Sequence, residues 1–253
     1  MRRIWISLSI LAVVTAVAVP NALSTGRSTP NLASSKLKGS ASARPLSRAS
    51  CPNPDGGSCR GVLRAGTYRT VSFEPRLSYT VPAGWANYED NLGNFNLASP
   101  GVSLSDAENA VNIILVWTAV QAAAMNCNGT SDPNATESAK GLAQWLAHHR
   151  GLIATQPRPV AIGGLQGYVL SVHPAPRGGI RCGGGSNVPL FNGFGNTGGQ
   201  FWLGGPSSSD HALVYLLTFR DLPLAIIADS GGRHRPSLAA DAKVIGHFHF
   251  AKS

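Results

Sequence analysis

The feature that most constrains the fold is a pair of short alternating segments between Leu63 and Trp85. Val71 and Phe73 alternate with polar neighbours, and the alternation of apolar and polar residues resumes from Leu77 to Val81. Alternation with a period of two is typical of half-buried β-strands. Because Glu74-Pro75 interrupts it, the stretch predicts two strands that are joined at a bend.

The same residues carry a resemblance to known proteins. The string L-x-A-G-T-Y-x-T-x-x-F-x-P-x-L-x-Y-T-V-P-x-G-W, from Leu63 to Trp85, resembles the opening of a group of exported, functionally uncharacterised actinobacterial proteins. V-A-I-G-G-L-Q-G, from Val160 to Gly167, is similar to the same group, and V-P-x-G-W resembles the start of Mog1/PsbP-like α+β domains. The resemblance covers about residues 63–250. Its motifs are turns and anchors, so it carries no catalytic residue across.

The rest of the chain predicts an α+β fold. The run VNIILVWTAV, from Val111 to Val120, is apolar on both faces, which predicts a central strand. Helical periodicity appears at Ser138–His149 and Pro236–Ile245. The apolar runs Ala212–Phe219 and Leu222–Ala228 are spaced as a hairpin. Hairpin-linked strands with two helices predict one domain over residues 61–250, with a largely antiparallel sheet. The resemblance implies a Mog1/PsbP-like sandwich.

The first sixty residues differ in character from the rest. Arg2-Arg3, an apolar run from Ile4 to Val19 and the small-residue site Ala22-Leu23-Ser24 predict a cleaved signal peptide over residues 1–24. A retained membrane anchor is the alternative, although the run is short for a span of about 20 residues. Residues 25–60 predict a disordered Ser/Ala/basic tether with a small cysteine loop. We therefore expect a secreted or cell-surface protein, without stable membrane insertion once the signal is cleaved.

The basic charge of the chain does not indicate nucleic-acid binding. The sequence has 21 Lys and Arg against 12 Asp and Glu, a net charge of +9. Seven of those basic residues and none of the acids lie in the first fifty positions, which leaves 14 basic against 12 acidic residues, a difference of +2. The excess belongs to the signal and the tether, so we expect no nucleic-acid partner.

Four cysteines, an even number, predict two disulfide bonds in an exported chain. They are Cys51, Cys59, Cys127 and Cys182, and three pairings are possible. The pairing Cys51–Cys59 with Cys127–Cys182 closes one small loop and ties two long ones. Zinc coordination is the alternative role of these cysteines, but the chain has no C-x-x-C spacing.

Two motifs suggest chemistry. Asp229-Ser230-Gly231-Gly232 looks like the nucleophile segment of trypsin-like proteases. However, only 23 residues follow Ser230, and Asp210 and Ser230 are spaced as the two ends of one hairpin, which does not suit that fold. A Gly-rich turn is the preferred interpretation. His247 and His249 form an H-x-H pair on one strand face, for which solvent-exposed histidines are the preferred interpretation over a metal site. We expect no metal and no cofactor.

Binding is expected instead at a Gly-rich region. Residues 178–205 contain eleven glycines and several aromatic residues, which predict a long loop with a strand near Gln200–Leu203. Its candidate binding residues are Asn187, Phe191, Asn192 and Phe194. We therefore expect a non-catalytic exported domain that binds an unknown ligand or protein partner. The alternative is an extracytoplasmic serine hydrolase that uses Ser230.

Overall fold

The computed structural model describes residues 61–102, 112–176, 178–182, 185–193, 199–204, 210–231 and 238–251. Contacts divide the chain into residues 1–46 and residues 47–253, and every described residue belongs to the second unit. The predicted signal peptide and tether, together with Cys51 and Cys59, lie outside the described residues.

Nine strands form one sheet, in which every pairing is antiparallel. This sheet, accompanied by two helices and two smaller sheets in the described part of the chain, confirms the α+β class. The order across the sheet is β1 (Gly61–Val62), β4 (Ala86–Asn91), β5 (Asn94–Ala98), β6 (Ile113–Thr118), β15 (Leu222–Asp229), β14 (Ala212–Phe219), β10 (Leu165–Pro174) and β8 (Leu152–Ala154), with β9 (Arg158–Ile162) paired to β10.

Strand β6 shows why both faces of this sheet are covered. Ile113 and Leu115 belong to one hydrophobic cluster, whereas Ile114 and Val116 belong to another. The strand lies between β5 and β15. The prediction of a central strand that is apolar on both faces is therefore confirmed.

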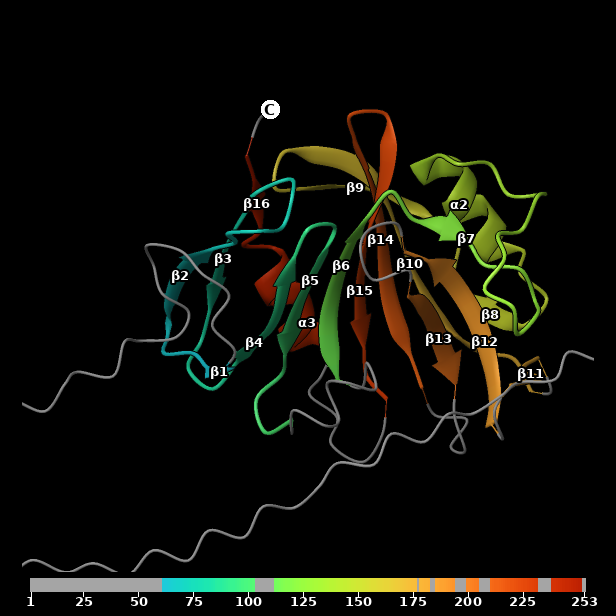
Figure 1. The fold of residues 1–253 in the computed structure, drawn as a ribbon, viewed down its shortest axis with the longest axis horizontal. Coiled ribbons are helices and arrows are strands. Elements are labelled where there is room, and N and C mark those ends of the chain that lie inside the picture. The colour runs from blue at the N-terminus through green and yellow to red at the C-terminus, as the bar shows by residue number, and fades with distance from the viewer. Residues whose placement is uncertain are drawn as a thin grey trace, which may run out of the picture. The chain divides into compact units, whose positions relative to one another are not determined.

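The two faces have different coverings, which lie on opposite sides of the sheet in Figure 1. One face is covered by α2 (Ala139–Ala147) and by a sheet of β7 (Gln121–Ala122), β11 (Ile180–Cys182), β12 (Gly185–Asn192) and β13 (Gln200–Gly204). The other face is covered by α3 (Leu238–Ile245) and by a sheet of β2 (Gly66–Arg69), β3 (Leu77–Val81) and β16 (His249–Phe250).

The two strands predicted between Leu63 and Trp85 form as β2 and β3, which pair with each other. The first of them ends earlier than the alternation suggests. The backbone N–H groups of Val71, Ser72 and Phe73 donate to the carboxylate of Asp90, at 2.6, 3.1 and 2.8 Å. A carboxylate that accepts three backbone bonds holds these residues in a bend, so the strand does not continue through Val71 and Phe73.

The Gly-rich region 178–205 differs most from the prediction. Most of its described residues lie in β11, β12 and β13 rather than in a long loop. Val188 and Leu190 on β12, with Phe201 and Leu203 on β13, are buried against the large sheet. Burial of this alternating apolar set stabilises the strands more than the neighbouring glycines destabilise them.

Both predicted helices form. Ser138 begins α2 as its N-cap, and its hydroxyl accepts a hydrogen bond from the backbone N–H of Gly141 at 3.0 Å. A Cβ at Gly141 would lie 2.5 Å from the Cβ of Thr136, so glycine lets the preceding loop close against the helix. No helix in the described ranges is long and apolar enough to cross a membrane.

Candidate functional site

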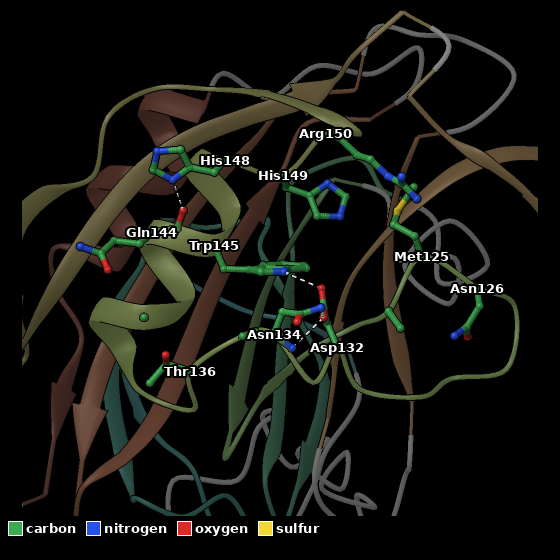
Figure 2. Close-up of a pocket in the computed structure, with 13 residues that line it drawn as sticks. Met125, Asn126, Asp132, Asn134, Thr136, Gln144, Trp145, His148, His149 and Arg150 are labelled. Atoms are coloured by element: carbon green, nitrogen blue, oxygen red, sulfur yellow. Dashed lines mark hydrogen bonds between the residues drawn. The ribbon is translucent and has the colours of Figure 1, made fainter.

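A pocket of about 770 Å³ lies between α2 and the loop that follows β7 (Figure 2). The loop contributes Asp132 and Asn134, and the helix and its end contribute Gln144, Trp145, His148, His149 and Arg150. Pockets that hold small ligands usually measure about 300–1,000 Å³. Its size and its mixture of polar groups with an aromatic ring make this pocket the candidate site.

Asp132 is the fixed negative charge of the pocket. Its Oδ1 accepts from the backbone N–H and the side-chain amide of Asn134, at 2.9 and 3.0 Å, and its Oδ2 accepts from the indole N–H of Trp145 at 3.0 Å. The hydrogen bond from the Asn134 backbone is the main reason that the pKa of Asp132 lies below its usual value, and the Trp145 bond adds to it against partial desolvation. Asp132 therefore remains ionised at neutral pH.

Trp145 presents its indole to the same space. The bond to Asp132 fixes the ring at its nitrogen, and the ring packs edge-on with His149, with centroids 4.7 Å apart and planes inclined at 64°. In the view of Figure 2, His149 and Asp132 lie on either side of the indole. The ring is thus held from two sides while it lines the pocket.

His149 contributes a buried hydrogen-bond donor. Its side chain is 8% exposed, and its Nδ1 accepts from the backbone N–H of Gly151 at 3.2 Å. Burial lowers the pKa of His149, the charge of Arg150 adds to this effect, and Asp132 opposes it. A neutral imidazole whose Nδ1 accepts must carry its proton on Nε2. That Nε2 is buried and has no hydrogen-bond partner among the described residues.

His148 has the opposite arrangement. Its Nδ1 lies 2.8 Å from the backbone carbonyl oxygen of Gln144, which can only accept, so Nδ1 is the donor. In the neutral ring, Nε2 is then an acceptor. Each of the two adjacent histidines therefore has its Nδ1 engaged by a backbone contact, as a donor in His148 and as an acceptor in His149.

The residues that the sequence suggested for binding lie elsewhere. Phe191 is 0% exposed and belongs to the core between β12 and the large sheet, so its side chain is not open to a ligand and that suggestion is wrong. Asn192 donates to the Ser131 hydroxyl at 3.3 Å, and Asn187 pairs with β11 and β13. Neither lines the pocket. Phe194 lies outside the described residues.

The sequence held a partial indication of the real pocket. Trp145 and His149 are four residues apart in the predicted helix, and this spacing places them on one face. Asp132 lies in the loop that follows β7. Nothing in the sequence pattern shows that this loop folds back onto the helix, since that contact depends on Gly141 and on the hydrogen bond from Trp145.

Among the described residues, Ser230 does not have the surroundings of a catalytic nucleophile. It follows β15 directly, and Asp210 precedes β14, so the two residues lie at the ends of one hairpin as their spacing predicted. The Ser230 hydroxyl donates to the backbone carbonyl of His211 at 3.1 Å, a group that does not take up a proton. Burial and the nearby charge of Asp210 raise the pKa of Asp229 to about 7.

The H-x-H pair is solvent-exposed. His247 and His249 are exposed, whereas Phe248 and Phe250 are buried in the core that α3 covers. His247 Nδ1 lies 2.7 Å from the backbone carbonyl oxygen of Lys243. The described ranges contain no group of three or more His, Cys, Asp or Glu that could hold a metal ion.

Cys127 is disulfide-bonded. Cys51, Cys59 and the side chain of Cys182 lie outside what the structure describes, so the pairing Cys127–Cys182 stays a prediction. The backbone of Cys182 lies on β11, which is linked through β12 to β7. Cys127 follows β7 by five residues.

Comparison with known proteins yields distant structural similarity. No model of a known protein family matches the chain, and no curated protein does. A structure from Bacteroides thetaiotaomicron VPI-5482 is 14% identical over 70% of this chain and 46% of its own length, with a TM-score of 0.30. The chain therefore spans less than half of that protein.

The solution structure of cyanobacterial PsbP (CyanoP) from Synechocystis sp. PCC 6803 is 12% identical over 78% of this chain and 99% of its own, with a TM-score of 0.33. A PsbP protein is thus among the similar structures, at low identity. Likeness at this level carries no functional argument, and the resemblance to exported actinobacterial proteins stays a prediction.

Proposed function

We propose that this protein is a non-catalytic domain that binds a small polar ligand in the pocket formed by Asp132, Trp145 and His149. The observation that carries this proposal is the buried Nε2–H of His149. A buried donor without an acceptor costs about 1–3 kcal/mol and His149 lines the pocket, so a ligand that accepts from it would offset this cost.

The pocket suits binding better than proton transfer. The Nδ1 lone pair of His149 is occupied by the N–H of Gly151, and the lowered pKa of Asp132 makes its carboxylate a weak base. A general base needs a free lone pair that faces the substrate proton. These side chains are therefore arranged to orient a ligand.

Export is part of the proposal. Arg2-Arg3 followed by the run Ile4–Val19 is the pattern of a secretory signal. A disulfide-bonded Cys127 supports it, because disulfides persist mainly in oxidising compartments outside the cytoplasm. N-terminal sequencing of the exported protein should find a start near Thr25, and retention of Met1 would favour an anchor instead.

The binding proposal is tested by NMR on the indole N–H of Trp145. Glucose, N-acetylglucosamine, glycine, glutamate and inorganic phosphate, each at millimolar concentration, form the probe set. At least one should shift this resonance, and His149→Phe should abolish that shift while the protein stays folded. His249→Phe is the matched control, since His249 is exposed and outside the pocket. If no probe moves the resonance, the proposed function is rejected.

A further inference from the structure

A second, smaller pocket lies against the same helix. It measures about 220 Å³, and the residues that decide its chemistry are Lys140, Gln156 and Tyr168. It shares Gln144 and His148 with the larger pocket. Residues four apart on a helix lie one above the other, so these two side chains form a ridge with a pocket on each side.

We infer that the ligand is a saccharide chain of two or more units, one in the larger pocket against Trp145 and the next across the ridge of Gln144 and His148, beside Tyr168. This inference rests on the proposed function and names its ligand class. It is argued from the hydrogen-bonding groups, the charges and the aromatic rings of the two pockets.

The hydrogen-bonding groups match hydroxyls. His149 offers a donor at Nε2, and His148, whose Nδ1 donates to the Gln144 carbonyl, has its Nε2 left for a ligand. Asp132 accepts three hydrogen bonds, and two carboxylate oxygens provide about four acceptor sites, so there is room for one more donor. A hydroxyl group both donates and accepts, and a sugar ring carries several of them at neighbouring carbons.

The charges disfavour an anionic ligand. Asp132 is ionised inside the larger pocket and repels a phosphate or carboxylate. The cationic side chains, Arg150 and Lys140, are exposed, where water and salt screen them. A neutral polyhydroxylated ligand avoids the repulsion by Asp132 and can still donate a hydrogen bond to it.

Trp145 lines the larger pocket and Tyr168 the smaller one. Trp145 is fixed before any ligand arrives, by its hydrogen bond to Asp132 and its packing with His149. A fixed ring loses little conformational entropy on binding. Sugar rings present a face of C–H groups that packs on aromatic rings. Two aromatic side chains on either side of a polar ridge therefore fit two successive sugar units.

The test is calorimetric titration of the full mature chain with glucose, N-acetylglucosamine and their β-1,4-linked tetrasaccharides, together with maltotetraose. One tetrasaccharide should bind roughly tenfold or more tightly than its monosaccharide, because the second contact becomes intramolecular. Ala147→Phe, which fills the smaller pocket, should remove that gain and leave monosaccharide affinity unchanged. Gln156→Ala changes only an exposed side chain of the smaller pocket. It is the second variant, with the same expected result, if Ala147→Phe does not fold.

The outcomes separate the two proposals. Binding of glycine, glutamate or phosphate to the Trp145 pocket, without any saccharide, overturns this inference and keeps the proposed function. Equal affinity for monosaccharide and tetrasaccharide also overturns the inference that the ligand is a saccharide chain. If no compound binds at all, both proposals fail.

Discussion

The indole nitrogen of Trp145 lies 3.0 Å from Oδ2 of Asp132, and this hydrogen bond joins the end of helix α2 to the loop that follows β7. The helix and the loop form the two walls of the candidate pocket. The same bond fixes the indole and, after the backbone bond from Asn134, helps to lower the pKa of Asp132, so it contributes to both the electrostatics and the shape of the site. Its loss should separate the walls.

Trp145→Phe should lower the free energy of unfolding by about 1 kcal/mol beyond the effect of the smaller ring, since hydrogen bonds to charged groups contribute somewhat more than neutral ones and Asp132 is partly exposed. Urea denaturation in a double-mutant cycle with Asp132→Asn measures the coupling. If the two substitutions are additive, the bond does not hold the walls together.

Phe191→Ala should destabilise the domain by about 3–5 kcal/mol, as expected when a fully buried phenylalanine is truncated. Asn187→Ala, a half-buried change on the same strand, is the control and should cost much less. Chemical denaturation of both variants decides the matter. A small loss for Phe191→Ala would restore the earlier expectation that this residue is offered to a partner.

The elements that periodicity predicted are those whose burial is decided locally. In β6, every position from Ile113 to Val116 is apolar, and in α2 the buried Leu142 and Leu146 recur at helical spacing. In the region 178–205, the buried apolar residues alternate only over the short segments Val188–Leu190 and Phe201–Leu203, and eleven glycines made this pattern hard to recognise. Those strands depend on a sheet that is distant in sequence, so local composition favoured a loop.

The site was less predictable still. Its groups come from a loop, a helix and the backbone of Gly151, and the tautomer of His149 is set by that last contact. Sequence spacing places Trp145 and His149 on one helix face but says nothing of the loop opposite. Whether a buried donor lacks an acceptor depends on the three-dimensional structure and does not follow from the sequence.

Ser230 should not react with a fluorophosphonate probe, because its hydroxyl proton is given to the backbone carbonyl of His211 rather than to a base. Labelling of the purified protein, followed by mass spectrometry, is the measurement, with Ser230→Ala as the control. Stoichiometric labelling that disappears in this variant would revive the hydrolase alternative.

Asp241 should make the domain less stable as the pH rises from about 4 to 7. Burial raises the pKa of Asp241 to about 7, against the opposing hydrogen bond from Ser99, while the unfolded value is 3.8. Between pH 3.8 and about 7, the folded state keeps a proton that the unfolded state releases. The contribution of Asp241 to stability is therefore fully present below pH 3.8 and is lost as the pH rises through about 7.

Urea denaturation at acidic and neutral pH, compared between wild type and Asp241→Asn, checks this. The variant should lose less stability than wild type over that interval. Asp229 contributes in the same direction because its pKa is also raised to about 7, and His149 contributes in the opposite direction, so only the difference between the two proteins is informative. Parallel profiles would show that Asp241 keeps an ordinary pKa.

Asp90→Ala should be among the most damaging single substitutions outside the apolar core. Its carboxylate, 3% exposed, accepts from the backbone N–H groups of Val71, Ser72 and Phe73, and its removal leaves these donors without their acceptor. Each buried donor that is left without an acceptor costs about 1–3 kcal/mol. The free energy of unfolding should therefore fall by several kcal/mol, even if water reaches the most exposed of the three N–H groups. Asp90→Asn keeps one acceptor oxygen and should lose less. Hydrogen exchange should show faster exchange at residues 71–73 in both variants, and unchanged protection there would mean that the bend is held by something other than Asp90.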